Sequence, residues 1–465
     1  MDGAAVNFGC RVGVVTRLQE KVPSLIPIHC CAHRLELVVK DILKRVPFFQ
    51  VVEDLLMSLY RFYHWSPLNW DELKRMGEAF NIVILKPPKA SGTRWLPHHE
   101  RAVVAVTRDF PALVQHLGEV ATQATGERKL KAAGLYKVIR TLKFASFLNF
   151  LRVFIPSMSG LSHLFQVNDS TVEMVATKVQ ALVTHFIKLQ TDEQKLSSIL
   201  HKDLVINDEE GVEQATWFET PLVVKSTLRH SPSTSAGVME ESMKNAQEVL
   251  GQTIGKLGER FDSYIANPVL KAANCFDMGN WPSEDDDDDD MEDFGASQVE
   301  AIYKHYKRIM DMKGFSLETA QAEWTELQVV LKRKYPNRDK KFIKLWPSVL
   351  RSFQDTGRFD NIFSIIRLLL IIPIHTSECE RTFSHMNFVK TDWRSRLQSS
   401  ALTSLLMIKL SPTTLEAFDP TNSISLWYDG GKRRPATQPY GSRAGRNEHE
   451  YAESEVSDET EDSDN

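Results

Sequence analysis

A cluster of polar residues near the C-terminus could do chemistry. Residues 377–384 read SECERTFS, in which Ser377 and Glu380 have the spacing of a helix capping box. Glu380 could instead bind a divalent metal ion, because phosphoryl-transfer sites hold such ions with carboxylate oxygens at rigid positions. The spacing alone favours the cap over the metal ligand.

A second cluster, residues 29–33 (HCCAH), places Cys30 and His33 at the spacing of zinc ligands. A structural zinc ion needs four ligands, and no second pair follows at the distance found in zinc fingers. The pattern therefore favours a buried cysteine and a histidine that bonds to the backbone, and we predict no metal site here.

Two further segments carry weaker signals. In residues 91–95 (SGTRW), Arg94 could pair with a phosphate and Trp95 could stack on an unpaired base. The alternative is that Trp95 packs against a predicted sheet while Arg94 covers it. In residues 2–7 (DGAAVN), Asp2 stands in a simple turn signal close to a terminus, where chains usually fray.

The elements that must position these residues begin with an α/β zone, residues 1–98. Apolar residues at helical spacing predict helices over residues 31–45 and 48–63. Residues 81–86 (NIVILK) are β-branched and are followed by two prolines, which predicts a buried strand.

The following zone, residues 99–344, is almost wholly helical by pattern. Its clearest predicted helices are residues 130–154, 170–189, 240–264 and 296–312. A third zone, residues 345–415, has three predicted helices around a short extended piece at 371–374, and these are residues 359–370, 377–390 and 401–410. From residue 416 the chain is a polar tail that we expect to be disordered, because it cannot bury enough apolar surface.

The composition is that of a globular protein, with 42% apolar and 25% charged residues. Five scattered cysteines indicate a reducing, intracellular compartment. We find no secretory signal, and no apolar run approaches the roughly 20 residues that a bilayer requires. We therefore expect neither a membrane nor a small-molecule substrate as a partner.

The net charge of −5 conceals an asymmetry. Residues 284–293 and 448–465 each carry nine acidic residues and no lysine or arginine, and the chain without these 18 residues has a net charge of +13. A basic body with acidic runs fits a protein that meets DNA or chromatin, although such runs are also common as solvated loops.

Taken in order, the clusters resemble motifs of the hAT superfamily of DNA transposases and of the vertebrate proteins descended from them. The start of the chain (DGA) resembles the element around the family's second catalytic aspartate, residues 30–35 its CxxHxL helix, and residues 91–95 its TRW motif. The C-terminal block is the strongest part of the resemblance. Residues 377–384, 394–397 (RSRL) and 402–408 resemble the family's terminal SxxERxFS, RxRL and LxxLLxI motifs.

The resemblance implies a ribonuclease-H-like core that is split by a large helical insertion. We therefore predict an α+β, predominantly α fold with four parts. They are a partial ribonuclease-H-like core (1–98), a helical insertion domain (99–344), a core-completing and hAT C-terminal dimerisation region (345–415) and a disordered tail (416–465).

By the same resemblance, Asp2 and Glu380 are vestigial forms of the second and third catalytic carboxylates. Trp95, beside Arg94, corresponds to the tryptophan that stacks on a base extruded at the cleavage site. The family would use magnesium. The first catalytic aspartate, its strand and the zinc-finger module of full-length members would all lie upstream of Asp2. We therefore expect an N-terminally truncated, domesticated remnant that is not an enzyme and uses no cofactor.

The predicted function is dimerisation with itself or with related hAT-derived proteins. Apolar residues of the last predicted helix would form the interface, namely Leu402, Leu405, Leu406 and Ile408. Non-specific DNA binding by the basic body and nuclear localisation, from residues 432–435 (KRRP), are further expectations. Two alternatives stay open: a fragment of an active, metal-dependent DNA transposase, and a chromatin scaffold whose acidic runs capture basic proteins.

Overall fold

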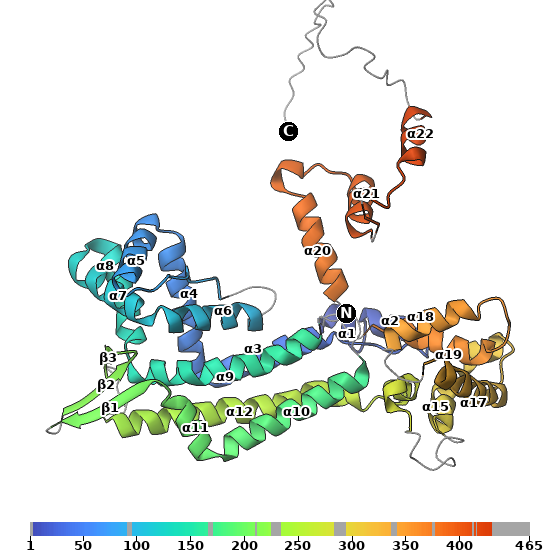
Figure 1. Ribbon diagram of the computed structural model, residues 1–465, viewed down its shortest axis with the longest axis horizontal. Coiled ribbons are helices and arrows are strands. Elements are labelled where there is room, and N and C mark those ends of the chain that lie inside the picture. Colours follow the sequence, from blue (N-terminus) through green and yellow to red (C-terminus); the bar gives the residue numbers. More distant parts are fainter. Residues whose placement is uncertain are drawn as a thin grey trace, which may run out of the picture. The chain divides into compact units, whose positions relative to one another are not determined.

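The computed structural model describes residues 3–90, 95–165, 171–209, 212–224, 234–282, 294–335, 342–373, 377–411, 413–414 and 416–429. Within these ranges, the side chains of Ala5, Glu209, Val212, Ser377, Glu378, Glu380 and Arg381 are not described. The chain divides into two compact units, Met1–Phe383 and Ser384–Asn465. The fold is α+β and predominantly helical, as predicted (Figure 1). The domain boundaries predicted at 98, 344 and 415 differ from the boundary between the units and remain predictions.

The first unit begins with the helices α1 (Ala5–Phe8), α2 (Val14–Lys21), α3 (Cys31–Arg45), α4 (Pro47–His64) and α5 (Pro67–Ala79). Helices α3 and α4 lie close to the predicted limits, whereas α1, α2 and α5 were not predicted. Proline stands in the first turn of both α4 and α5, where its missing N–H costs nothing. Ser66 caps α5, because its side chain accepts a hydrogen bond of 3.3 Å from the backbone N–H of Asn69.

The strand predicted over residues 81–86 is not formed in the part of the chain that the structure describes. Asn81 lies in a turn with a φ of 56°, residues 82–86 have no regular secondary structure, and no described strand pairs with them. Instead, the backbone N–H of Leu85 donates to Asp109 Oδ2 at 2.7 Å, and Arg108 donates to the carbonyl of Val83. Side chains thus satisfy backbone groups that a neighbouring strand would otherwise bind. The described residues of 3–90 form no sheet of the ribonuclease-H type.

A long helical region follows, with elements α6 (Trp95–Arg108), α7 (Phe110–Gln123), α8 (Gly126–Ile139), α9 (Leu142–Leu164), α10 (Val172–Thr191), α11 (Glu193–Leu200) and α12 (Ser235–Ile265). The single helix predicted over residues 130–154 is broken between α8 and α9. Thr141 lies at the break, where its hydroxyl accepts from Phe144 N at 3.2 Å and its backbone forms a bridge with Val223. The N-cap begins a new helix at Leu142.

A small antiparallel sheet contradicts the expectation that this region is almost wholly helical. Its strands are β1 (Leu204–Glu209), β2 (Val212–Trp217) and β3 (Thr220–Leu222), in the order β1-β2-β3. Residues Phe218 and Glu219 take positive φ angles of 47° and 62°, which makes the tight turn between β2 and β3. Trp217 anchors the sheet, because it is buried against Phe110 with ring centroids 4.5 Å apart.

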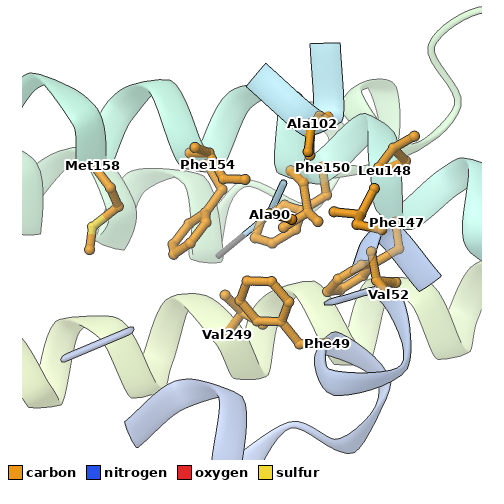
Figure 2. Packing of buried hydrophobic residues seen from close by; sticks show 14 of the residues in the cluster. Phe49, Val52, Ala90, Ala102, Phe147, Leu148, Phe150, Phe154, Met158 and Val249 are labelled. Carbon is orange, nitrogen blue, oxygen red and sulfur yellow. The ribbon is translucent and has the colours of Figure 1, made fainter. Parts of the chain in front are cut away.

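The larger hydrophobic core lies around α9 and draws residues from α3 to α12. Phenylalanine rings stack within it: Phe150 and Phe154 (Figure 2) have ring centroids 5.5 Å apart. Phe154 also stacks on Phe186, at 5.4 Å. Helix α9 is long and apolar enough to cross a membrane, whereas the sequence was expected to contain no apolar run of that length. However, 72% of the 18 consecutive residues that make it so are buried inside the protein, so α9 has the composition of a core helix.

A second core in the same unit is built on tryptophans. The helices around it are α13 (Pro268–Ala272), α15 (Ala296–His305), α16 (Lys307–Met312), α17 (Leu317–Lys334), α18 (Phe342–Ser352) and α19 (Asp360–Leu370). Trp324 donates from Nε1 to the carbonyl of Phe294 at 2.9 Å, and Trp346 donates to the carbonyl of Phe276 at 2.9 Å. Gly295 has a φ of 83°, and a Cβ there would lie 2.6 Å from Trp324 Nε1. Only glycine fits this position without rearrangement.

The C-terminal part contains α20 (Ser377–Val389), the 3₁₀ turn η3 (Asp392–Arg394), α21 (Ser399–Leu410) and α22 (Thr421–Asp429). Helices α20 and α21 agree with the prediction. Helix α22 lies within the tail that was predicted to be disordered from residue 416, so that prediction was wrong for these nine residues. The local sequence explains the helix, because four of its nine residues are large and apolar and Asp419 binds its first residue.

Candidate functional site

The C-terminal helices α20, α21 and α22 are notable because none of their described residues is buried. Large apolar side chains are nevertheless exposed along residues 384–429, and these are Phe388, Trp393, Met407, Ile408, Leu410, Phe418, Ile424, Leu426, Trp427 and Tyr428. Soluble proteins rarely expose many apolar side chains in one part of the chain unless that part binds something. The C-terminal helices are therefore the candidate interaction site.

Helix α21 has the apolar composition of a core helix, but none of its residues is buried. Its serine and threonine hydroxyls bond within the helix: Thr403 donates to the Ser399 carbonyl at 2.9 Å and Ser404 to the Ser400 carbonyl at 3.1 Å. Of the predicted interface residues, Leu402, Leu405 and Leu406 are half-buried, whereas Ile408 is 74% exposed. A helix of this length is marginal in water by itself. It needs packing that its own chain does not complete.

Within the second unit, α20 and α21 are linked by one cation–π contact. The ammonium of Lys409 lies 5.2 Å from the ring centroid of Phe388, which is itself exposed. Trp393, in the turn η3 between the two helices, is 98% exposed. Such contacts contribute about 0.5–1 kcal/mol at exposed sites, so this one orients the helices but does not replace a core.

The elements that precede these helices are firmly packed. Glu323 on α17 binds the start of α19, because its carboxylate accepts from Asn361 Nδ2 at 2.7 Å and from Ile362 N at 2.9 Å. Ile362, Ile365 and other residues of α19 are buried in the tryptophan-rich core. The described residues of α17 and α19 therefore belong to a rigid base that precedes the C-terminal helices in the chain.

The predicted catalytic carboxylates are not brought together by any described contact. Asp2 lies outside the described residues, and Glu380 lies on α20 with a side chain that is not described. The choice between cap and metal ligand for Glu380 therefore stays a prediction. In the ranges that the structure covers, no group of three or more histidine, cysteine, aspartate or glutamate residues could hold a metal ion.

Trp95 is buried at the start of α6, and Arg94 lies outside the described residues. The indole donates from Nε1 to Glu53 Oε1 at 3.0 Å, and the backbone N–H donates to Glu36 Oε2 at 2.8 Å. One face of the ring stacks on His99, with centroids 3.7 Å apart and an interplanar angle of 13°. In this conformation the ring has the surroundings of a packed residue, and stacking on a base would require it to leave them.

The HCCAH cluster lies at the start of α3. Cys30 is buried, and His33 is half-buried with its ring centroid 5.5 Å from that of His29. Arg34 of the same motif binds α12, because it donates to the carbonyl of Arg260 and to Ser263 Oγ, the latter at 3.2 Å. These bonds of Arg34 fasten α3 to α12, and the structural role of Cys30 and His33 stays a prediction.

His29 makes the stability of this region depend on pH. Burial, with a contribution from Arg34, lowers the pKa of His29 to about 4, below its ordinary value of about 6.5. The unfolded chain therefore takes up a proton between pH 6.5 and 4 that the folded chain does not, and the free energy of unfolding falls as the pH falls through this window. His116, whose pKa burial also lowers, acts in the same direction.

We expect His29→Gln to reduce the loss of stability between pH 7 and pH 5, measured by urea unfolding at both pH values. Residual loss should remain because of His116. The matched control is His64→Gln, since His64 is exposed on α4 and has no part in this cluster. Equal pH dependence in wild type and His29→Gln would contradict the assignment.

Several exposed residues were not predicted from the sequence: Phe388, Trp393 and the apolar side chains of α22. The missed signal was the number of large apolar residues in 384–429, which exceeds what so short a segment can bury in itself.

A known protein family matches this part of the chain. Residues 325–411 match the hAT family C-terminal dimerisation region, a range that runs from α17 to the residue after α21. The match supports hAT-family membership and a role in dimerisation.

Proposed function

We propose that this chain acts by dimerisation, through the hAT C-terminal dimerisation region at residues 325–411, and that α21 forms the centre of the contact. One observation carries the proposal: seven of the twelve residues of α21 are apolar, yet its own chain buries none of them. The interface residues are Leu402, Leu405, Leu406 and Ile408. The first partner is a second copy of the chain, and a related hAT-derived protein could take its place by presenting the same helix.

Apolar burial is the favourable term for this contact. Full burial of a leucine or isoleucine side chain contributes about 1.5–3 kcal/mol. In a symmetric dimer each of the four residues contributes twice, since the same patch occurs on both copies. Three of the four are already half-buried, so Ile408 and the exposed Met407 gain most from association.

The full chain and a chain that ends at Phe383, the last residue of the first unit, test this proposal. Light scattering should give the mass of two chains for the full protein and the mass of one chain for the shorter form. A single-chain mass for both proteins would contradict the proposal. A two-chain mass for both would place the contact outside α21.

We further propose that the function does not involve DNA cleavage, as for a domesticated remnant of a transposase. The position of Trp95 supports this, because its indole is engaged by Glu53 and His99. Non-specific DNA binding in the nucleus is a separate proposal, supported by the net charge of +13 outside the two acidic runs. It requires an affinity that is independent of DNA sequence and falls steeply as salt rises.

The alternative, an active transposase fragment, makes the opposite prediction about cleavage. With magnesium or manganese and a hairpin or terminal-repeat DNA, we expect the full chain to nick no more than Glu380→Gln does. Gel electrophoresis of end-labelled DNA measures this. Metal-dependent nicking by the wild type that Glu380→Gln abolishes would establish the enzyme instead, because Glu380 is the predicted third carboxylate.

A further inference from the structure

We infer that α22 (Thr421–Asp429) is a second element of the dimer contact and that it packs on a second copy of this chain. The helix lies beyond residue 411, outside the part of the chain that matches the dimerisation region. The inference rests on the proposed dimerisation and extends the contact to a segment that the family match does not include.

Local bonds determine where α22 begins. Asp419 Oδ1 accepts from the backbone N–H of Thr421 at 3.0 Å and from its hydroxyl at 2.6 Å. Ile424 N donates to the carbonyl of Pro420 at 2.9 Å, which closes the first turn. Hydrogen bonding to Thr421 lowers the pKa of Asp419, so the cap is a carboxylate at neutral pH. These bonds start a helix, but isolated helices shorter than roughly 12–15 residues are marginal in water.

The side chains that α22 presents are those of an interface. Ile424, Trp427 and Tyr428 lie at positions i, i+3 and i+4, so they share one face of the helix. About half of each side chain is exposed, at 50%, 47% and 51% respectively. Tryptophan and tyrosine are enriched among the residues that dominate binding energy at protein interfaces. Leu426, on the other side of the helix, is 72% exposed.

The position of α22 in the chain indicates its partner. Ten residues, 411–420, separate it from α21, and both helices belong to the same compact unit. Ten residues span at most about 36 Å, so α22 stays near whatever α21 binds. Once α21 holds a second copy, that copy is present at a high effective concentration for α22. Two-fold symmetry would then bury two copies of α22 in one assembly.

Trp427→Ala tests the inference, with Asn422→Ala as the matched control on the same helix. Asn422 is exposed and polar and lies on the side of α22 opposite Ile424, Trp427 and Tyr428, so we expect its replacement to change the dimer dissociation constant less than twofold. Trp427→Ala should raise that constant at least tenfold, measured by sedimentation equilibrium of the full chain. An unchanged constant for Trp427→Ala, alongside a raised constant for Ile408→Asp in α21, would overturn the inference and leave the proposed function standing. A wild-type chain that is monomeric throughout would overturn both.

A second measurement distinguishes a contact between copies from a contact within one chain. In protein labelled with 5-fluorotryptophan, the ¹⁹F resonance that Trp427→Phe removes belongs to Trp427. We expect this resonance to shift as the protein is concentrated through the dimer dissociation constant. A resonance that does not move with concentration, or that moves equally in the Ile408→Asp variant, would show that Trp427 packs within its own chain and would overturn the inference.

Discussion

Ile408→Asp should make the chain monomeric at concentrations where the wild type is a dimer, and should raise the dimer dissociation constant about 100-fold. Ile408 is 74% exposed, so the substitution removes little packing from the isolated chain. In the dimer it removes apolar burial and places an ionised carboxylate in the contact, where an unpaired charge is costly. Sedimentation equilibrium of both proteins gives the two dissociation constants.

Ser400→Asp is the control for this experiment. Ser400 is exposed and lies on the same helix, on the side away from Leu402, Leu405 and Leu406, so the variant introduces the same charge outside the predicted contact. Its dissociation constant should stay close to that of the wild type. If both variants weaken the dimer equally, the effect arises from charge or helix propensity, and Ile408 is not an interface residue.

Trp324→Ala should lower the free energy of unfolding by about 3–5 kcal/mol, the largest stability effect that we expect of one substitution. Trp324 is 1% exposed, lies against Trp281 and Phe276, and donates a hydrogen bond to the carbonyl of Phe294. The variant therefore creates a large cavity and removes the shorter of two hydrogen bonds to that carbonyl, which Gln328 Nε2 also donates to at 3.3 Å. Urea unfolding monitored by circular dichroism measures the change.

Trp65→Ala is the matched control, because Trp65 is 73% exposed at the end of α4. Its replacement should change the free energy of unfolding by less than about 0.5 kcal/mol. If Trp324→Ala were as mild as Trp65→Ala, the tryptophan-rich core would not be the rigid base that holds α18 and α19.

Hydrophobic periodicity was sufficient to predict most helices, including α3 at its observed limits and α19 and α21 within two residues. Hydrophobic periodicity could not predict which segments pair as β-strands. The apolar, β-branched residues 81–86 form no strand, and Asp109 and Arg108 bind their backbone in place of a partner strand. Strands β1 to β3 were missed because three short strands are hard to detect within a long helical pattern.

The candidate site could be predicted in part. The apolar pattern and the resemblance of residues 402–408 pointed to α21, whose side chains the structure leaves largely unburied. Helix α22 was missed because the tail was judged by its overall polarity and not by residues 421–429 alone. The contacts of Trp95 could not be predicted from its neighbours in the sequence, because its hydrogen-bond partner Glu53 lies 42 residues earlier in the chain.

The mass of the unmodified full-length chain over a dilution series tests the central claim most directly. Dimerisation through α21 predicts a mass of two chains at high concentration that falls to one chain on dilution, with Ile408→Asp at the one-chain mass over the same range. A one-chain mass for the unmodified protein at every concentration would contradict self-association. A two-chain mass for Ile408→Asp at every concentration would contradict the role of α21.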